Sequence, residues 1–233
     1  MSYSALLRLA EHFRASNEIG CALQCMQAAA EKSTSQFHAA HVNMLIGVML
    51  LKHAKNVSEC KHYLLEAISQ SKQLDIEDEK VRQIYFRACS YLSDYYSQIQ
   101  SHSTDAIQLL KGAIANAKAS PYWHLRLILK LVRLKCDGDE LDRQKYLEVG
   151  AQLAQEHASS PYLKMLFLLA KSLDQLKAGS FHSGEFSQAM SQIESLVNQQ
   201  SQLPHGQLYS IKLFLQSLQV VFLFCLISSL CVT

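Results

Sequence analysis

The chain has 233 residues, 49% of them apolar, and its 22 Lys and Arg residues nearly balance its 20 Asp and Glu residues. This apolar content suffices for a continuous core and excludes a disordered chain, while the balanced charge gives no surface field of one sign that would indicate nucleic-acid binding. Gly and Pro together supply only 11 of the 233 residues, less than half of the ordinary share of roughly 12%. β-Sandwiches, β-barrels and doubly wound sheets need frequent tight turns, so the composition excludes them and predicts helix nearly throughout.

Apolar residues recur at i, i+3, i+4 and i+7 along eleven segments, which predicts eleven amphipathic helices. Ser120 before Pro121 and Ser160 before Pro161 mark two of the starts, because serine caps a helix and proline fits its first turn. The expected helices span residues 3–15, 18–32, 35–54, 57–73, 77–99, 103–118, 121–136, 140–157, 160–178, 183–200 and 206–231.

Two long segments of the chain repeat each other. Residues 44–72 align with residues 90–118 without a gap at an offset of 46. In each pair of helices, the second helix carries a small, a large and a small residue at i, i+4 and i+7. This set recurs as Ala22/Met26/Ala29, Cys60/Leu64/Ala67 and Ala106/Leu110/Ala113, with weaker copies at Arg143/Leu147/Gly150 and Phe186/Met190/Ile193.

Small residues at these places let helices approach closely, as a stack of helix pairs requires. The spacing resembles that of the tetratricopeptide repeat, although the usual helix-ending proline is missing and the period exceeds the standard length. We therefore predict an all-α fold, a right-handed α-solenoid of divergent tetratricopeptide-like helix pairs, with about five pairs over residues 1–212. A generic helical bundle that packs on its alanines is the alternative.

Residues 213–233 contain no charged residue. Their length permits a membrane span, but Gln216, Ser217 and Gln219 dilute the first third and leave only residues 220–232 strongly apolar. We interpret the segment as a buried final helix, atypical or truncated, whose uncapped apolar end predicts poor solubility. A tail anchor is the alternative, and it would make the chain a tail-anchored adaptor on an organelle membrane.

No arrangement of residues indicates catalysis or a bound metal. The chain lacks the glycine-rich phosphate loop, the nucleophile elbow and the H-E-x-x-H motif, and its ten histidines lie outside any such context. Cys21, Cys25, His38 and His41 approach zinc-finger spacing, but the two residues between the histidines are too few to direct both toward one ion. We predict no enzyme activity, no cofactor and no metal site.

A basic stripe lies on the helix that begins at Pro121. Arg126, Lys130 and Arg133 are spaced at i, i+4 and i+7 and therefore share one helical face. A patch for nucleic acid or an acidic peptide is one interpretation. Because no aromatic residues for base stacking are interleaved with it, a solvated helix face is the better one.

Several strings are more particular than a repeat consensus: SALLRLAEHFRAS (4–16), CALQCMQAA (21–29), SPYWHLRLILKL (120–131) and YLKMLFLLAKSL (162–173). In this order they resemble the tetratricopeptide subunit of the cohesin loader, over about residues 4–220. The resemblance implies a non-enzymatic scaffold that wraps the extended N-terminal segment of the Nipped-B-type adherin subunit, with cohesin and chromatin as indirect partners. It also implies a nuclear location and roles in cohesin loading and sister-chromatid cohesion. Family members are much longer, so the resemblance covers only their N-terminal part.

The repeat register predicts a partner-binding groove. In a tetratricopeptide array, the first-helix positions that face inward lie three before, one after and four after the small residue. A mixture of apolar and charged residues at such positions suits a peptide with apolar anchors, whereas packing against a neighbouring helix is the alternative interpretation. With positions 10, 47, 93, 130 and 170 as anchors, the groove residues are Leu7, Glu11, Arg14, Met44, Val48, Leu51, Ser90, Asp94, Ser97, Leu127, Leu131, Leu134, Phe167, Lys171 and Asp174.

Overall fold

The computed structural model describes residues 1–53, 58–75, 78–98, 103–134, 140–156, 161–178, 183–199 and 205–230. Over these residues the chain forms eleven α-helices and no strand, which confirms the all-α prediction. Each helix lies within a few residues of the segment in which the apolar period predicts it. The local sequence pattern therefore decides where the helices form.

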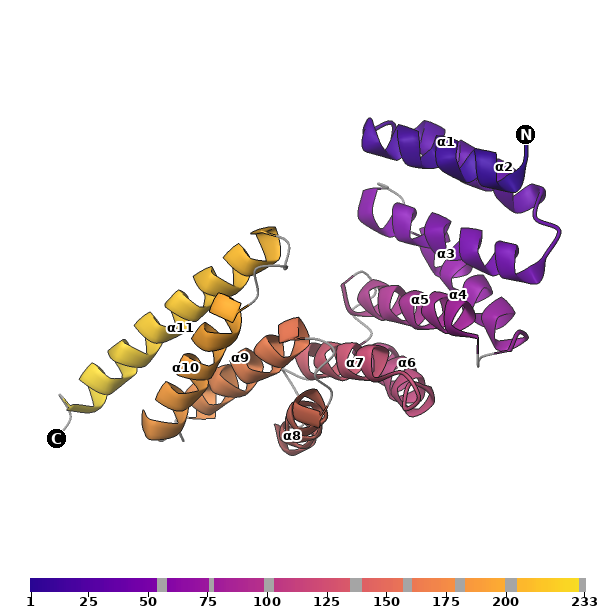
Figure 1. Ribbon diagram of the computed structural model, residues 1–233. Helices are drawn as coiled ribbons and strands as arrows, with labels where there is room; N and C mark the ends of the chain where they lie inside the picture. Colours follow the sequence, from indigo (N-terminus) through magenta and orange to yellow (C-terminus); the bar gives the residue numbers. More distant parts are fainter. Residues whose placement is uncertain are drawn as a thin grey trace. The chain divides into compact units, whose positions relative to one another are not determined.

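The chain divides into two compact units, and Figure 1 labels the helices of both. Unit 1, Met1–Ala119, holds three helix pairs, and unit 2, Ser120–Thr233, holds two pairs and a further helix. The pairs of unit 1 are α1 (Tyr3–Ala15) with α2 (Ile19–Glu31), α3 (Gln36–His53) with α4 (Ser58–Lys72), and α5 (Glu79–Gln98) with α6 (Ser103–Asn116). Unit 2 pairs α7 (Pro121–Leu134) with α8 (Glu140–Glu156) and α9 (Pro161–Ala178) with α10 (Ser183–Gln199), and ends with α11 (His205–Leu230).

Within a unit, each pair packs on the next through its second helix. In unit 1, α2 contacts α3 and α4 contacts α5, and the first helices α3 and α5 also contact each other. Unit 2 has the same scheme, with both α7 and α8 against α9. Each pair thus buries one face inside the pair and another on its neighbour, which is the packing of a solenoid.

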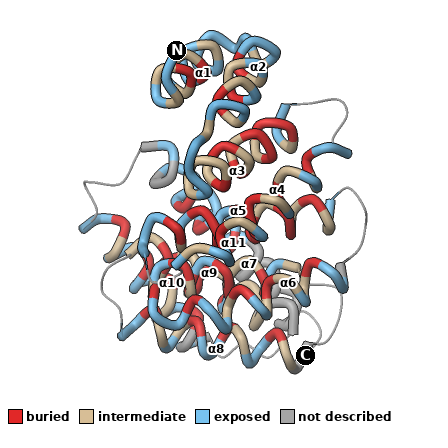
Figure 2. Tube along the Cα trace, turned by 90° about the vertical axis from the view of Figure 1, so that its right-hand side faces the viewer, coloured by how far each residue is buried: buried red, intermediate tan, exposed pale blue. Residues whose placement is uncertain are grey.

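Four of the second helices, α4, α6, α8 and α10, bury the same four positions, and α2 buries the first three of them, Ala22, Met26 and Ala29. The residues at i, i+4, i+7 and i+11 form a buried stripe, and Figure 2 shows the buried parts of the helices in red. This stripe includes the small and large residues of the sequence repeat and extends it by one turn. Its members are Cys60/Leu64/Ala67/Ser71 in α4, Ala106/Leu110/Ala113/Ala117 in and just after α6, Arg143/Leu147/Gly150/Ala154 in α8, and Phe186/Met190/Ile193/Val197 in α10.

The first helices repeat in the same register. Positions 40, 42, 44, 46, 47 and 49 of α3 are buried, and so are the positions 46 residues later in α5, which are 86, 88, 90, 92, 93 and 95. The offset in the sequence is therefore also an offset in packing. It places Gly47 and Ser93 at equivalent points where α3 and α5 cross their second helices.

Asn17 makes the tight turn between α1 and α2. Its φ of 61° is left-handed, a conformation that asparagine tolerates better than most residues. The Glu18 amide donates to the Phe13 carbonyl at 2.8 Å, and the Asn17 amide donates to the Arg14 carbonyl at 3.1 Å. These two bonds satisfy carbonyl groups at the end of α1, so the turn can be short.

The last helix joins the core of unit 2 with its first half. Ile211, Leu215 and Leu218 are buried in one cluster with Met165 of α9 and Phe186 of α10. The helix α11 continues without a break past residue 213, where the sequence suggests a change from repeat array to apolar tail. In the part of the chain that is described, no helix combines the length and apolar character that a membrane crossing needs.

Replacing Gly47 with alanine is expected to destabilise unit 1. A Cβ atom at this position would lie 2.7 Å from Leu64 Cγ and 2.8 Å from Leu64 Cδ2, and Leu64 is fully buried. We expect the free energy of unfolding to fall by about 1–3 kcal/mol in urea denaturation followed by circular dichroism. Gly112→Ala in α6 is the matched control, because its Cβ would meet no atom within 4 Å. This control should gain about 0.5–1 kcal/mol from helix propensity, so equal effects at the two sites would contradict the close α3–α4 approach.

Candidate functional site

A cavity of unit 1, which we call the larger cavity, is lined by residues of the first helices of all three pairs and by Met26 of α2. It has a volume of about 310 Å³ and an apolar wall of leucine, valine and methionine side chains. Charged and aromatic side chains complete its rim. The lining residues are Leu7, Glu11 and Arg14 of α1, Met26 of α2, Leu45, Val48, Met49, Lys52 and His53 of α3, and Arg87 and Tyr91 of α5.

Four of the predicted groove residues meet in this cavity. Leu7, Glu11 and Arg14 come from α1, and Val48 comes from α3. Glu11 and Val48 hold equivalent register positions in two successive helix pairs, each one residue after the small residue, so the repeat register places them on the same side of the unit. Of the other predicted residues in unit 1, Leu51, Asp94 and Ser97 are half-buried and lie outside this lining.

Positive charge predominates at the rim of the larger cavity. Arg14, Lys52 and Arg87 are exposed cations, whereas Glu11 is the single carboxylate in the lining. Arg14 Nε donates to Glu11 Oε2 at 2.9 Å, and this hydrogen bond lowers the pKa of Glu11. The Lys52 ammonium lies 5.4 Å from the centre of the Tyr91 ring, which is a cation–π distance. The cavity thus combines an apolar wall with a cationic rim.

A smaller cavity lies between α3 and α5 and has a volume of about 160 Å³. Arg87 contributes to the lining of both cavities. The smaller one presents cationic and polar groups from α5 and an imidazole from α3 over an apolar floor. Its lining residues are Phe37, His41, Met44, Lys80, Gln83, Ile84 and Arg87.

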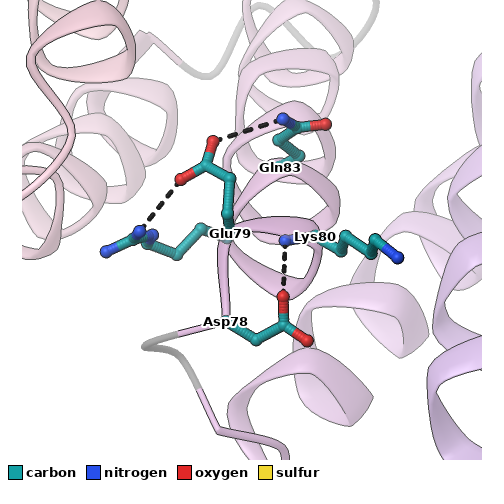
Figure 3. A network of polar contacts seen from close by, with 5 residues as sticks. Asp78, Glu79, Lys80 and Gln83 are labelled. Carbon is teal, nitrogen blue, oxygen red and sulfur yellow. Dashed lines mark hydrogen bonds and ion pairs between the residues drawn. The ribbon is translucent and has the colours of Figure 1, made fainter.

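A polar network positions the start of α5 beside the smaller cavity (Figure 3). Asp78 accepts a hydrogen bond from the Lys80 amide at 2.9 Å, as a residue that caps a helix does. Glu79 accepts from Arg82 at 2.9 Å and from Gln83 at 3.2 Å. The Lys80 side chain extends away from this network in Figure 3, so its ammonium group is not committed to Glu79.

His38 and His41 belong to an aromatic cluster with Tyr3. The Tyr3 hydroxyl lies 3.1 Å from His41 Nδ1 and 3.2 Å from the His38 carbonyl oxygen, and the Tyr3 and His38 rings stack at 4.2 Å. Burial lowers the pKa of His41, and the charges of Arg87 and His38 lower it further. Among the described residues, no group of three or more His, Cys, Asp or Glu side chains could hold a metal ion.

Five of the predicted groove residues are buried, as the alternative interpretation of packing against a neighbouring helix expects. Met44, Ser90, Leu127, Leu131 and Phe167 are buried. The reason is that α3 packs on α5 and α7 packs on α9, so the next first helix covers positions that a single helix would expose. Met44 reaches only the floor of the smaller cavity.

The remaining predicted residues lie in unit 2. Leu134 is half-buried at the end of α7, and Lys171 is exposed on α9. Asp174 forms an ion pair with Arg143 of α8, so its carboxylate is engaged within the protein. The predicted residues that line one cavity are thus the four of unit 1, Leu7, Glu11, Arg14 and Val48.

One residue of the basic stripe on α7, Arg126, contacts aromatic side chains of the same helix. Arg126 Nη1 donates to the Tyr122 hydroxyl at 2.7 Å, and its guanidinium lies 5.3 Å from the Trp123 ring centre. Arg133 is exposed and Lys130 is half-buried. Since Arg126 is occupied by its own aromatic neighbours, the stripe is a weaker candidate site than the cavities of unit 1.

Lys80, Arg87 and Tyr91 of α5 line the cavities but were not among the predicted groove residues. A signal for them exists in the sequence, because with Gln83 and Ile84 they form a stripe at helical spacing on one side of α5. The register set by the small residue Ser93 instead predicts Ser90, Asp94 and Ser97 of the same helix.

The chain is similar to known proteins over most of its length. Residues 2–227 match the sequence profile of the family described as “Cohesin loading factor”. Over 174 residues the chain is 32% identical to the proteins named “MAU2 chromatid cohesion factor homolog” of Drosophila melanogaster and Drosophila yakuba, and 30% identical to that of Drosophila willistoni. These alignments cover 73% of this chain and 26–27% of each relative, so the chain spans about a quarter of their length.

Proposed function

This chain belongs to the cohesin loading factor family, and on that premise we propose that it is a non-catalytic scaffold that binds the extended N-terminal segment of the Nipped-B-type adherin subunit. In this proposal it supports cohesin loading on chromatin and sister-chromatid cohesion in the nucleus. The printed names of its relatives, chromatid cohesion factor homologs, support the role in cohesion.

The larger cavity of unit 1 carries the proposal. Leu7, Val48 and their apolar neighbours offer a surface for apolar side chains, and the rim offers Arg14, Lys52 and Arg87 to polar groups. Binding energy in such interfaces concentrates on a few apolar anchors, while surrounding charges fix the register and exclude other partners. An extended chain laid across successive helix pairs would meet both kinds of contact.

Co-purification of the full chain with a tagged N-terminal segment of the adherin tests this function. We expect a one-to-one complex in size-exclusion chromatography with light scattering. Val48→Asp introduces a carboxylate into the apolar wall and is expected to weaken binding at least about tenfold.

Leu65→Asp is the matched control, because Leu65 is 42% exposed on α4 and lines neither cavity. It should leave both the helical content and the affinity unchanged. Failure of a well-folded wild-type chain to bind the segment, or equal affinity of the Val48→Asp and wild-type chains, would exclude this mode of binding.

A further inference from the structure

The two cavities of unit 1 lie along one stripe of α3. Phe37, His41 and Met44 line the smaller cavity, and Leu45, Val48, Met49 and Lys52 line the larger one. Their spacing of three or four residues places them on one side of the helix. Arg87 of α5 borders both cavities. We call the combined lining of the two cavities the α3–α5 furrow.

Both ends of the α3–α5 furrow have cations and apolar residues in their lining, and they differ in that the larger cavity has more apolar residues and the carboxylate Glu11. The larger cavity has an apolar wall that includes Leu45, Val48 and Met49. The smaller cavity has two permanent cations, Lys80 and Arg87, and among its described lining residues there is no carboxylate. Gln83 and His41 add groups that can donate hydrogen bonds to an anion. One end thus suits an apolar side chain and the other an anionic one.

The distance between the two ends sets a spacing for the ligand. Val48 and His41 are seven positions apart on α3, which is about 10 Å along the helix axis at ~1.5 Å per residue. An extended peptide covers about 10 Å with three residues, at ~3.3 Å each. A peptide that places an apolar side chain beside Val48 therefore brings a side chain about three positions away to the smaller cavity.

We infer that the α3–α5 furrow recognises an extended peptide in which an apolar residue and an anionic residue, a carboxylate or a phosphorylated hydroxyl, lie about three positions apart. Arg87 and Lys80 would hold the anion, because charge-assisted hydrogen bonds to such groups are short and strong. The inference deepens the proposed function, since it states what the bound segment must contain.

The surroundings of His41 support an anion at this place. Its imidazole faces Tyr3 of α1, its own helix contributes Phe37 and His38, and α5 contributes Lys80 and Arg87. The groups around it are therefore cationic or neutral. A bound anion would offset the repulsion that Arg87 exerts on a protonated imidazole, so the His41 side chain is a local reporter of binding.

The test uses the full chain and short blocked peptides, followed by NMR titration of the His41 side chain. The probes are acetyl-Leu-Ala-Ala-Glu-amide and its phosphoserine analogue, each also in reversed order. The Glu peptide of the preferred order should bind about tenfold more tightly than its Gln counterpart. A Leu-Glu-Ala-Ala peptide, with the two groups adjacent, should bind like the Gln peptide. The tighter of the Glu and phosphoserine probes identifies the source of the anion.

Arg87→Gln should abolish the difference between the Glu and Gln peptides, and Lys80→Gln should reduce it. Lys118→Gln is the matched control, because Lys118 is exposed in unit 1 and lines neither cavity. Equal binding of the Glu and Gln peptides, or a difference that survives Arg87→Gln, would overturn the inference. If the chain binds the adherin segment but binds the Glu and Gln peptides equally, only the peptide specificity of the furrow is rejected. If the chain distinguishes the two peptides but does not bind the adherin segment, only the adherin is rejected as the partner.

Discussion

Arg143→Ala is expected to lower the free energy of unfolding of unit 2 by about 3–5 kcal/mol, because it leaves a largely buried carboxylate without its cation. Arg143 of α8 pairs with Asp174 of α9, and their side chains are only 7% and 17% exposed. The position is an Ala or Cys in three earlier second helices, at Ala22, Cys60 and Ala106. An arginine here therefore depends on a partner that the other pairs do not need.

The chain has a single tryptophan, Trp123, which is buried in unit 2. Its fluorescence in urea thus follows the unfolding of that unit separately from unit 1. Arg133→Ala removes an exposed arginine from the same unit and should change the free energy of unfolding by less than about 0.5 kcal/mol. A comparably small effect of Arg143→Ala would show that the ion pair is not buried in solution.

The double variant Arg143→Leu with Asp174→Leu tests whether the attraction within the ion pair exceeds the cost of removing its two charges from water. In the described part of the chain, Arg143 Nε has no hydrogen-bond partner, so the pair does not fully replace the hydration of its charges. Buried pairs of this kind often add little compared with apolar residues of similar size. We therefore expect the double variant to recover most of the stability that either single variant loses.

The helices and their pairing could be predicted from the sequence because both depend on local spacing. The apolar period gives each helix its buried stripe, and the small residue at position 47 marks where α3 meets Leu64 of α4. The residues that form such a contact belong to one helix pair and are close in sequence. A gapless repeat then carries the same register into α5 and α6.

The candidate site could be predicted only in part, because exposure depends on the next pair. Met44 and Val48 are both apolar residues of α3, one helical turn apart, yet Met44 is buried and Val48 is half-buried. No local feature distinguishes them, since the difference arises from where α5 lies on α3. The same long-range packing brings Arg87 of α5 to both cavities.

The ion pair between Arg143 and Asp174 could not be predicted from the sequence either. Asp174 fits a solvated face when α9 is considered alone, and Arg143 is a charged residue at a repeat position that three earlier second helices fill with Ala or Cys. They meet only because α8 packs against α9, which turns two charged positions toward the interior of unit 2. Charged residues at buried repeat positions therefore indicate contacts between neighbouring pairs that a single-helix pattern does not reveal.

Phe167→Ala is expected to destabilise unit 2 by about 3–5 kcal/mol, as deletion of a buried aromatic ring does. Phe167 of α9 is 1% exposed, and its ring occupies the space that Gly150 of α8 leaves open. A Cβ at position 150 would lie 2.1 Å from Phe167 Cε1. The ring therefore serves the packing of α8 on α9, and its loss should appear in Trp123 fluorescence during urea denaturation.

Val48→Ala provides the comparison, because Val48 is a half-buried residue of the larger cavity. It should affect stability less than Phe167→Ala and should weaken partner binding. The contact itself is tested by Gly150→Ala, which forces its methyl group against the ring and should be destabilising alone. In the Phe167→Ala background the same methyl enters vacated space, so the two effects should not add. Simple additivity would contradict the contact between Gly150 and the Phe167 ring. A Phe167→Ala chain that keeps its stability but loses binding would show that Phe167 belongs to the partner-binding groove.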